Sequence, residues 1–333
     1  MRVVVTGASG NAGTSLLRAL ADDDRVDEIV GLARRRPSRE VPKTEWRSAD
    51  VERNDLETIF RDADCVVHLA WAIQPSHDLA VLRRTNVDGS ERVFRAVAEV
   101  GVPALVYASS VGAYSPGPKD RPVDESWPTE GTPTSFYSRH KAEVEALLDR
   151  FQAERPETRV VRLRPGLIFK RGSAEEQRRY FLGPLFPRLL ARDGAIAIVP
   201  DIGGLRFQAV HSLDVGEAYR LAVVGDARGA FNIAAEPVLD PDTLAWALGA
   251  RKLPLPARLV RGGMAATWQF RLQPTPPGWL DMGLSVPIMD TTRAREVLGW
   301  EPRHSSIEAI RDVLSGIADA AGEPTPPLES ARR

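Results

Sequence analysis

Tyr137 and Lys141 stand four residues apart, a spacing that places both side chains on one face of a helix. A lysine ammonium close to a phenol favours the phenolate form and so lowers the pKa of the tyrosine toward neutrality. Such a tyrosine can exchange a proton with a hydroxyl or carbonyl group of a small molecule. The pair therefore predicts acid–base chemistry at a carbon-bound oxygen.

Two serines, Ser109 and Ser110, close an apolar run that predicts a strand over residues 104–109. Ligands of parallel α/β sheets bind beyond the carboxyl ends of the strands. We therefore predict that Ser110 hydrogen-bonds the reacting oxygen and that Ser109 is a structural or cofactor-facing neighbour. For either serine, the alternative is a hydroxyl that merely caps the strand end.

A glycine-rich segment, residues 6–13, follows the first predicted strand and opens a helix. Gly7 suits a tight turn, Gly10 lets the backbone approach a pyrophosphate, and Gly13 allows the helix to pack close to the strand. The helix N-terminus adds free N–H donors. The segment predicts a dinucleotide site, the alternative being a turn without a ligand, and the expected contacts are Gly7, Ser9, Gly10, Asn11, Ala12 and Gly13.

The second predicted strand ends in a run of arginines that begins with Arg34 and Arg35. An NAD site has an acidic residue here against the ribose 2′-hydroxyl, whereas guanidinium groups pair with a 2′-phosphate. We therefore predict NADP as the preferred cofactor, with NAD as the alternative if the arginines form a solvated loop.

The elements that position these residues alternate between short β-branched runs and helical patterns, as in βαβ units on a parallel sheet. This alternation predicts a doubly wound α/β domain. Strands are expected at 2–6, 28–33, 65–70, 104–109 and 159–163, and helices at 15–20, 79–100 and 141–151.

Beyond residue 165 the regular alternation ends, and prolines interrupt the pattern. A strand at 207–210, a helix from Asp214 and a strand at 229–233 are expected to rejoin the sheet. We predict a dinucleotide-binding domain over 1–165, rejoined by about 207–235. A smaller, mostly helical substrate lobe comprises 166–206 and 236–320, and a flexible tail follows at 321–333.

Composition excludes several classes of function. With 44 basic and 45 acidic residues, the net charge of −1 predicts neither a nucleic-acid nor a membrane partner. A single cysteine, Cys65, excludes an intrachain disulfide and a thiolate cluster, and we predict no metal site. The short apolar start of the chain does not resemble a signal peptide, so a cytoplasmic location is expected.

Taken together, the motifs resemble those of the extended short-chain dehydrogenases/reductases, the NAD-dependent epimerase/dehydratase family, whose fold is a Rossmann domain with a substrate lobe. The resemblance implies that Asp50 and Val51 lie at the adenine and that Lys141 also holds the nicotinamide ribose. It further implies cofactor contacts from Leu69, Ala70, Trp71, Asn86 and Pro165. The matching segments are residues 6–13, 50–51, 66–70, 85–89, 109–110, Tyr137 with Lys141, 164–166, 211–215, 231–233 and 298–302.

Three departures from the family concern the substrate. Family dehydratases carry an Asp-Glu pair after the catalytic hydroxyl, where this chain has Val111 and Gly112. Nucleotide-sugar epimerases usually place an arginine at the position of Phe207, although Arg206 is adjacent, and the family's Asn-Pro is replaced at residues 165–166. These departures disfavour dehydration and put a UDP-sugar substrate in question.

The favoured interpretation is an oxidoreductase that moves hydride between a nicotinamide cofactor and a carbonyl or secondary alcohol. Tyr137 is its acid/base, Lys141 lowers the tyrosine pKa and Ser110 polarises the oxygen. A sugar 4-epimerase with retained NAD and a non-catalytic dinucleotide sensor are the alternatives. By analogy with the family, a homodimer through helices at 79–100 and 141–151 is possible, and the substrate is not specified by these motifs.

Overall fold

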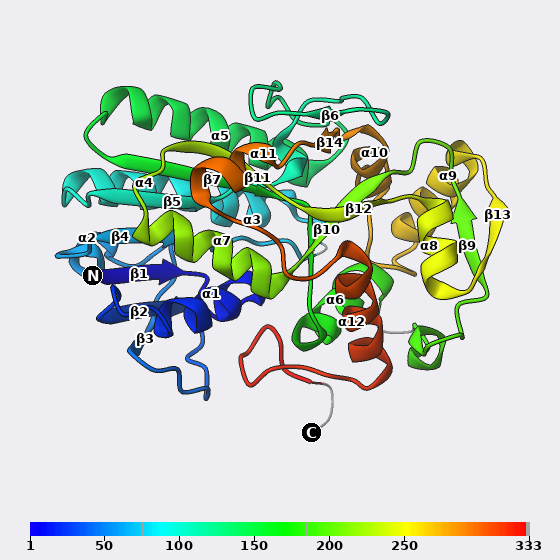
Figure 1. Cartoon of the computed structure of the whole chain (residues 1–333), viewed down its shortest axis with the longest axis horizontal. Coiled ribbons are helices and arrows are strands. Elements are labelled where there is room, and N and C mark those ends of the chain that lie inside the picture. Colours follow the sequence, from blue (N-terminus) through cyan, green and yellow to red (C-terminus); the bar gives the residue numbers. More distant parts are fainter. Residues whose placement is uncertain (75, 184–185, 331–333) are drawn as a thin grey trace.

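A seven-stranded parallel sheet forms the centre of the molecule in the computed structural model, which describes residues 1–74, 76–183 and 186–330 (Figure 1). The strand order is β11-β7-β5-β4-β1-β2-β3. Its β-branched runs are buried on both faces, as parallel sheets require. The strands are β1 (Arg2–Thr6), β2 (Glu28–Ala33), β3 (Thr44–Ser48), β4 (Cys65–His68), β5 (Ala104–Ala108), β7 (Arg159–Pro165) and β11 (Gly229–Ile233).

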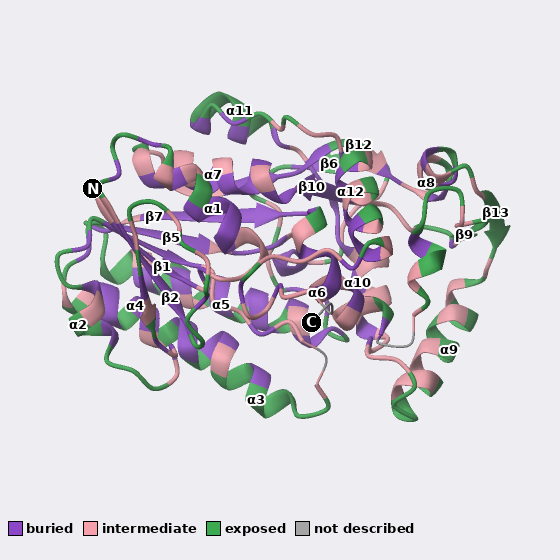
Figure 2. Cartoon of the chain, turned by 90° about the horizontal axis from the view of Figure 1, so that it is seen from below, coloured by how far each residue is buried: buried purple, intermediate pink, exposed green. Residues whose placement is uncertain are grey.

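Helices cover both faces of this sheet, so that the strands are buried between two layers (Figure 2). One apolar core joins the sheet to α1, α7 and α11, and a second core joins it to α2, α4 and α5. The doubly wound fold is thus confirmed. The helices are α1 (Asn11–Ala21), α2 (Leu56–Phe60), α3 (Leu79–Arg83), α4 (Gly89–Glu99), α5 (Phe136–Glu154), α7 (Ser212–Val224) and α11 (Thr292–Leu298).

The order of the strands determines where a ligand can bind. The chain runs from β1 to β2 on one side and places β4 on the other side of β1, so the winding direction reverses between β1 and β4. A crevice forms at such a switch point, beyond the carboxyl ends of the strands. The glycine-rich loop after β1 and the residues after β4 and β5 share this edge.

The smaller part of the molecule combines short strands and helices (Figure 1). Its strands form three small sheets, ordered β12-β10-β8, β13-β9 and β14-β6. The strands are β6 (Pro122–Val123), β8 (Leu167–Phe169), β9 (Ile198–Asp201), β10 (Phe207–His211), β12 (Ala235–Leu239), β13 (Arg251–Pro254) and β14 (Ile288–Met289), and the helices are α6 (Ala174–Gln177), α8 (Pro241–Leu248), α9 (Ala257–Gln269), α10 (Gly278–Ser285) and α12 (Ser306–Ala318).

Three elements differ from the sequence-based expectation. The edge strand β3 was not predicted, because four of its five residues are at least partly exposed and give no apolar run. The expected helix at 79–100 is divided by a π-helical turn at Arg84–Asp88. The strand β10 does not rejoin the central sheet but pairs with β8 and β12, whereas β11 does join it.

The chain after α12 is packed against the rest of the molecule over residues 321–330. Glu323 forms ion pairs with Arg39 and with Lys170, and Leu328 is fully buried. The expectation of a flexible tail therefore differs from the structure in this segment, whose contacts come from residues distant in sequence. Residues 331–333 lie outside the described part.

Candidate active site

The glycine-rich loop joins β1 to α1 at the switch point. Gly7 has φ +69°, and a Cβ there would lie 2.6 Å from the backbone nitrogen of Ala70. A Cβ on Gly13 would lie 2.5 Å from the carbonyl oxygen of Gly7. The loop therefore needs these two glycines for its own packing.

Gly10 is different, because a Cβ there would meet no described protein atom closer than the Gly7 oxygen at 3.4 Å. Gly10 lines the cavity, and its missing side chain leaves room for a ligand. Next to it, the Asn11 side chain donates to the Ile168 oxygen at 3.0 Å, while its Oδ1 is buried without a partner in the described chain. The start of α1 thus fits a dinucleotide pyrophosphate, which its free N–H groups would hold.

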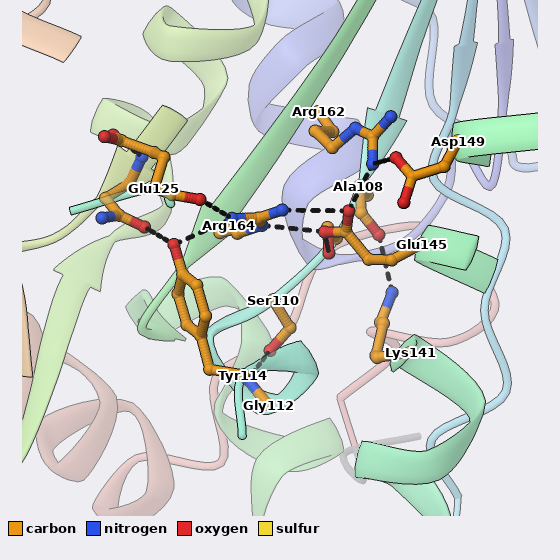
Figure 3. A network of polar contacts seen from close by, with 12 residues as sticks. Ala108, Ser110, Gly112, Tyr114, Glu125, Lys141, Glu145, Asp149, Arg162 and Arg164 are labelled. Carbon is orange, nitrogen blue, oxygen red and sulfur yellow. Dashed lines mark hydrogen bonds and ion pairs between the residues drawn. The ribbon is translucent and has the colours of Figure 1, made fainter. Parts of the chain in front are cut away.

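The helix α5 supplies Tyr137 and Lys141. Ser135 caps this helix, since its hydroxyl accepts a hydrogen bond from the Ser138 N–H. Lys141 Nζ donates to the Ala108 oxygen at 2.6 Å and lies 3.4 Å from the centre of the Trp71 ring. Because this oxygen ends β5, the contact ties α5 to the edge of the sheet where the crevice opens (Figure 3).

Ser110 follows β5 and starts a 3₁₀ turn, Val111–Ala113. Its Oγ accepts a hydrogen bond from the Gly112 N–H at 3.0 Å (Figure 3), and its side chain also hydrogen-bonds Tyr137, which slightly lowers the tyrosine pKa. Ser110, Tyr137 and Lys141 line the same cavity as the glycine-rich loop, with a volume of about 460 Å³. The structure thus brings the predicted catalytic residues together beside the predicted phosphate site.

The electrostatics differ from the expectation that Lys141 brings the Tyr137 pKa toward neutrality. Burial raises the pKa of Tyr137 to about 12, because the phenolate would lose its solvation. Burial likewise holds the pKa of Lys141 well below its usual value, against the opposing charge of Glu145. In this state the Lys141 amino group is engaged by Ala108 and Trp71 rather than by the phenol.

A buried ionic network lies between α5 and β7 (Figure 3). Glu145, one turn after Lys141 on α5, is fully buried and accepts hydrogen bonds from Arg162, Arg164 and Ser109. The two arginines stand on β7, so the network joins α5 to the neighbouring strand. The arginine charges and the Ser109 hydrogen bond outweigh desolvation and lower the pKa of Glu145 to about 2.

The other residues predicted to bind the cofactor fall into two groups. One group lines the cavity: Gly7, Gly10, Asn11, Ala12, Gly13, Leu69, Trp71, Ser109 and Pro165. The other group lies outside this lining: Ser9, Arg34, Arg35, Asp50, Val51, Ala70 and Asn86.

Three residues of the second group, Arg34, Arg35 and Asn86, follow or contact segments that come directly after strands of the central sheet. Arg34 and Arg35 are exposed directly after β2, whose Leu32 oxygen accepts a hydrogen bond from the loop residue Ala8. Asn86 is buried, and its amide bonds both the N–H and the oxygen of Ala72. This pairing fixes the chain after β4 and so explains how an asparagine can support the site without lining it.

The structure also reveals site residues that sequence analysis did not predict. They come from β8, α6, a π-helical turn at Arg178–Leu182, β10, α10 and α12, where no motif marked them. Only Phe207 was noted, as the residue that replaces an arginine. The additional lining residues include Phe169, Glu176, Phe181, Phe207, Trp279, Met282 and Leu314.

In the described part of the chain, no three His, Cys, Asp or Glu side chains are grouped as metal ligands would be. Within the same residues, no helix has the length and apolar character needed to cross a membrane. Cys65 and His68 are buried in β4.

Comparison with known proteins agrees with this architecture. The model of the NAD dependent epimerase/dehydratase family matches residues 3–234. The chain belongs to this family. It is an extended short-chain dehydrogenase/reductase, and as an NAD-dependent enzyme of this type it has the Rossmann fold expected from its motifs.

Two similar proteins and one similar solved structure show which proteins this family member resembles. An uncharacterized protein of Mycobacterium bovis is 27% identical, over 94% of this chain and 83% of its own length. The NAD-dependent glucose-6-phosphate dehydrogenase of Haloferax volcanii is 31% identical, over 53% of this chain and 72% of its own. The structure of Thermus thermophilus UDP-glucose 4-epimerase in complex with NAD has a TM-score of 0.69 and 22% identity, covering 96% of this chain and 100% of that one.

Within this epimerase/dehydratase site, the turn after Ser110 leaves little space. A Cβ on Gly112 would lie 2.8 Å from Tyr137 Cε1 and 3.0 Å from Met282 Sδ. A larger side chain at this position would have to displace the tyrosine ring or Met282. The Val111–Gly112 sequence is therefore built into the packing around Tyr137.

Proposed function

We propose that the protein transfers hydride between a nicotinamide dinucleotide and a carbonyl or secondary alcohol group of a small molecule. The observation that carries this proposal is that Ser110, Tyr137 and Lys141 line one cavity with the glycine-rich loop. When bound, the dinucleotide supplies or takes up the hydride. The start of α1, with Gly10 and Asn11, would hold its pyrophosphate.

The protein side chains manage the proton and the oxygen. Tyr137 is protonated at neutral pH, because its pKa is about 12, so it can donate a proton to a carbonyl oxygen. Ser110, which hydrogen-bonds the phenol, would orient the same oxygen. Lys141, held by Ala108, would hold the nicotinamide ribose and, once charged, would favour the phenolate in the oxidation direction.

For the cofactor we propose a preference for NADP over NAD. No acidic side chain follows Ala33 at the end of β2, where one would bind the ribose 2′-hydroxyl. Arg34 and Arg35 are exposed there and have no ion pair with any described residue, so their guanidinium groups are free for a 2′-phosphate. The site is also compatible with NAD, the cofactor named in the family description.

The alternative functions have weaker support. A sugar 4-epimerase with retained NAD is favoured by the fold of the Thermus thermophilus enzyme, but Phe207 lines the cavity where such enzymes usually have an arginine. Dehydration would need an acidic pair after Ser110, where this chain has Val111 and Gly112. The tight packing at Gly112 also leaves no room for a carboxylate. A protein that only senses the dinucleotide would not need Ser110, Tyr137 and Lys141 grouped in one cavity.

Coenzyme titration tests the reductase and NADP proposals together. We expect Arg34→Ala to weaken NADPH binding by about 1.5–3 kcal/mol, the range for a hydrogen bond to a charged group, while leaving NADH almost unchanged. The control is Arg258→Ala, an exposed arginine on the distant helix α9. Equal affinities for both coenzymes in both proteins would refute the NADP preference, and NAD retained through purification without net coenzyme consumption would favour the epimerase.

A further inference from the structure

The cavity that Tyr137 lines also has a group of apolar, mostly aromatic lining residues, Phe181, Phe207, Trp279 and Met282, which we call the aromatic wall. The Trp279 ring lies 5.0 Å from the Tyr137 ring and 5.2 Å from the Phe181 ring, measured between centroids. Met282 packs beside the same tyrosine at Gly112. The reacting oxygen would therefore meet Tyr137 with its carbon skeleton against apolar side chains.

The aromatic wall is fixed by close packing of the backbone. A Cβ on Gly278 would lie 2.3 Å from the Thr134 oxygen, so the start of α10 touches the loop before α5. Phe136 on α5 makes an edge contact with Trp279, with centroids 6.4 Å apart. Trp279 thus has a fixed position relative to Tyr137, and the apolar surface is a preformed part of the site.

The charges in the cavity serve the cofactor and the acid–base group. Among the described residues that line it, Lys141 is the only cation and Glu176 the only carboxylate. Lys141 is held by Ala108 and Trp71, and the free N–H groups at the start of α1 form the anion site used by the dinucleotide. No described lining side chain remains to neutralise a second diphosphate.

Arg206, next to Phe207 in sequence, does not fill this gap. Its guanidinium donates to the backbone oxygen of Lys119 and lies 4.0 Å from the Asp240 carboxylate, and Arg206 is not among the lining residues. Burying a diphosphate against aromatic rings without a cation would be strongly unfavourable.

We propose that the substrate is an uncharged, apolar ketone or secondary alcohol with a ring that packs against the aromatic wall, and not a nucleotide sugar. This inference rests on the proposed hydride transfer at Tyr137. In carbonyl reduction the coenzyme's hydride bonds to the carbonyl carbon and Tyr137 gives its proton to the oxygen. The oxidised coenzyme and the alcohol leave, and the Tyr137 phenolate takes up a proton from water.

Binding measurements separate this inference from the proposed reaction. Dinucleotide binding is measured first, and the cofactor-loaded protein is then titrated calorimetrically with acetophenone, cyclohexanone and UDP-glucose. We expect the two ketones to bind and UDP-glucose to show no saturable binding. Binding of UDP-glucose, or binding of neither class, would overturn the substrate assignment, whereas ketone binding without coenzyme oxidation would support that assignment and refute the reaction.

Variants of the aromatic wall locate the binding. Trp279→Leu should weaken acetophenone binding on the order of tenfold to a hundredfold, as expected for the loss of a buried aromatic contact, while dinucleotide affinity stays within about twofold. Trp246→Leu, an exposed tryptophan on α8, is the matched control and should change neither. Phe207→Leu offers a second test with a smaller change, and unchanged ketone affinity in both wall variants would overturn the inference.

Discussion

Tyr137 is a partly buried phenol whose pKa, about 12, keeps it protonated at neutral pH. A protonated phenol can donate to a carbonyl but cannot accept a proton from an alcohol. We expect kcat/KM for ketone reduction to vary little between about pH 6 and 9, whereas kcat/KM for alcohol oxidation rises by up to about tenfold per pH unit. Steady-state rates in both directions measure this, and an oxidation rate that does not change over the same range would contradict the assigned role.

Lys141 lies between the Trp71 ring and the Ala108 oxygen, deep in the cavity. Once charged, its ammonium would favour the phenolate, and its amine is expected to contact the nicotinamide ribose. Lys141→Met should therefore move the rise of alcohol oxidation to higher pH and also weaken dinucleotide binding. Lys252→Met, an exposed lysine in β13, is the control. If Lys141→Met kept the parent pH profile and cofactor affinity, the pair would have only a structural role.

At the scale of elements, the catalytic helix α5 depends on the buried Glu145. Glu145→Gln keeps the shape but leaves Arg162 and Arg164 without their buried carboxylate, so we expect a loss of about 3–5 kcal/mol in the free energy of unfolding. Glu143 on the same helix forms an exposed pair with Arg83 of α3 and is the control, so Glu143→Gln should cost less than about 1 kcal/mol. Urea unfolding compares the two, and equal losses would contradict the role of the network.

The same network predicts a dependence of stability on pH. The pKa of Glu145 is about 2 in the folded protein, below its usual value of 4.5, so its contribution is present above about pH 4.5. The contribution is lost as the pH falls from there through about 2. The difference in unfolding free energy between the wild type and Glu145→Gln should shrink over this range.

The elements that could be predicted are those whose apolar residues form a clear pattern within the element itself. The strands at 2–6, 28–33 and 229–233 follow from short apolar runs. The helix expected at 141–151 begins earlier in the structure, at Phe136 after the Ser135 cap, a signal that was not used. The edge strand β3 could not be predicted in this way, because its half-exposed residues alternate without a clear apolar face. The π-helical turn after α3 likewise does not change the spacing of the apolar residues, so it could not be predicted.

The same distinction holds for the site, where only residues that form a motif in the sequence could be predicted. The predicted catalytic residues and the glycine-rich loop form motifs with fixed spacing, and the structure brings them into one cavity. The aromatic wall has no such spacing, since Phe181, Phe207 and Trp279 come from three separate segments that only tertiary packing brings together. The pKa of Tyr137 was mispredicted because the spacing of residues gives no information on burial.

At the scale of the whole molecule, the cavity is built from both parts of the chain. The Rossmann domain supplies the glycine-rich loop and α5, while α6, α10 and α12 close the other side. The segment after α12 links the two parts, because Glu323 pairs with Arg39 after β2 and with Lys170 after β8. Cofactor and substrate would therefore meet in a cavity that needs both parts in place.

A deuterium label on the transferred hydride tests the central claim most directly. The wild-type protein is given acetophenone and NADPH that carries deuterium at the transferable C4 position, and the product alcohol is examined by mass spectrometry. We expect one deuterium on the carbinol carbon for each coenzyme oxidised, and in Tyr137→Phe the same transfer slowed by about 10²–10⁴ with coenzyme affinity unchanged. An alcohol without deuterium, or wild-type turnover in Tyr137→Phe, would contradict the account.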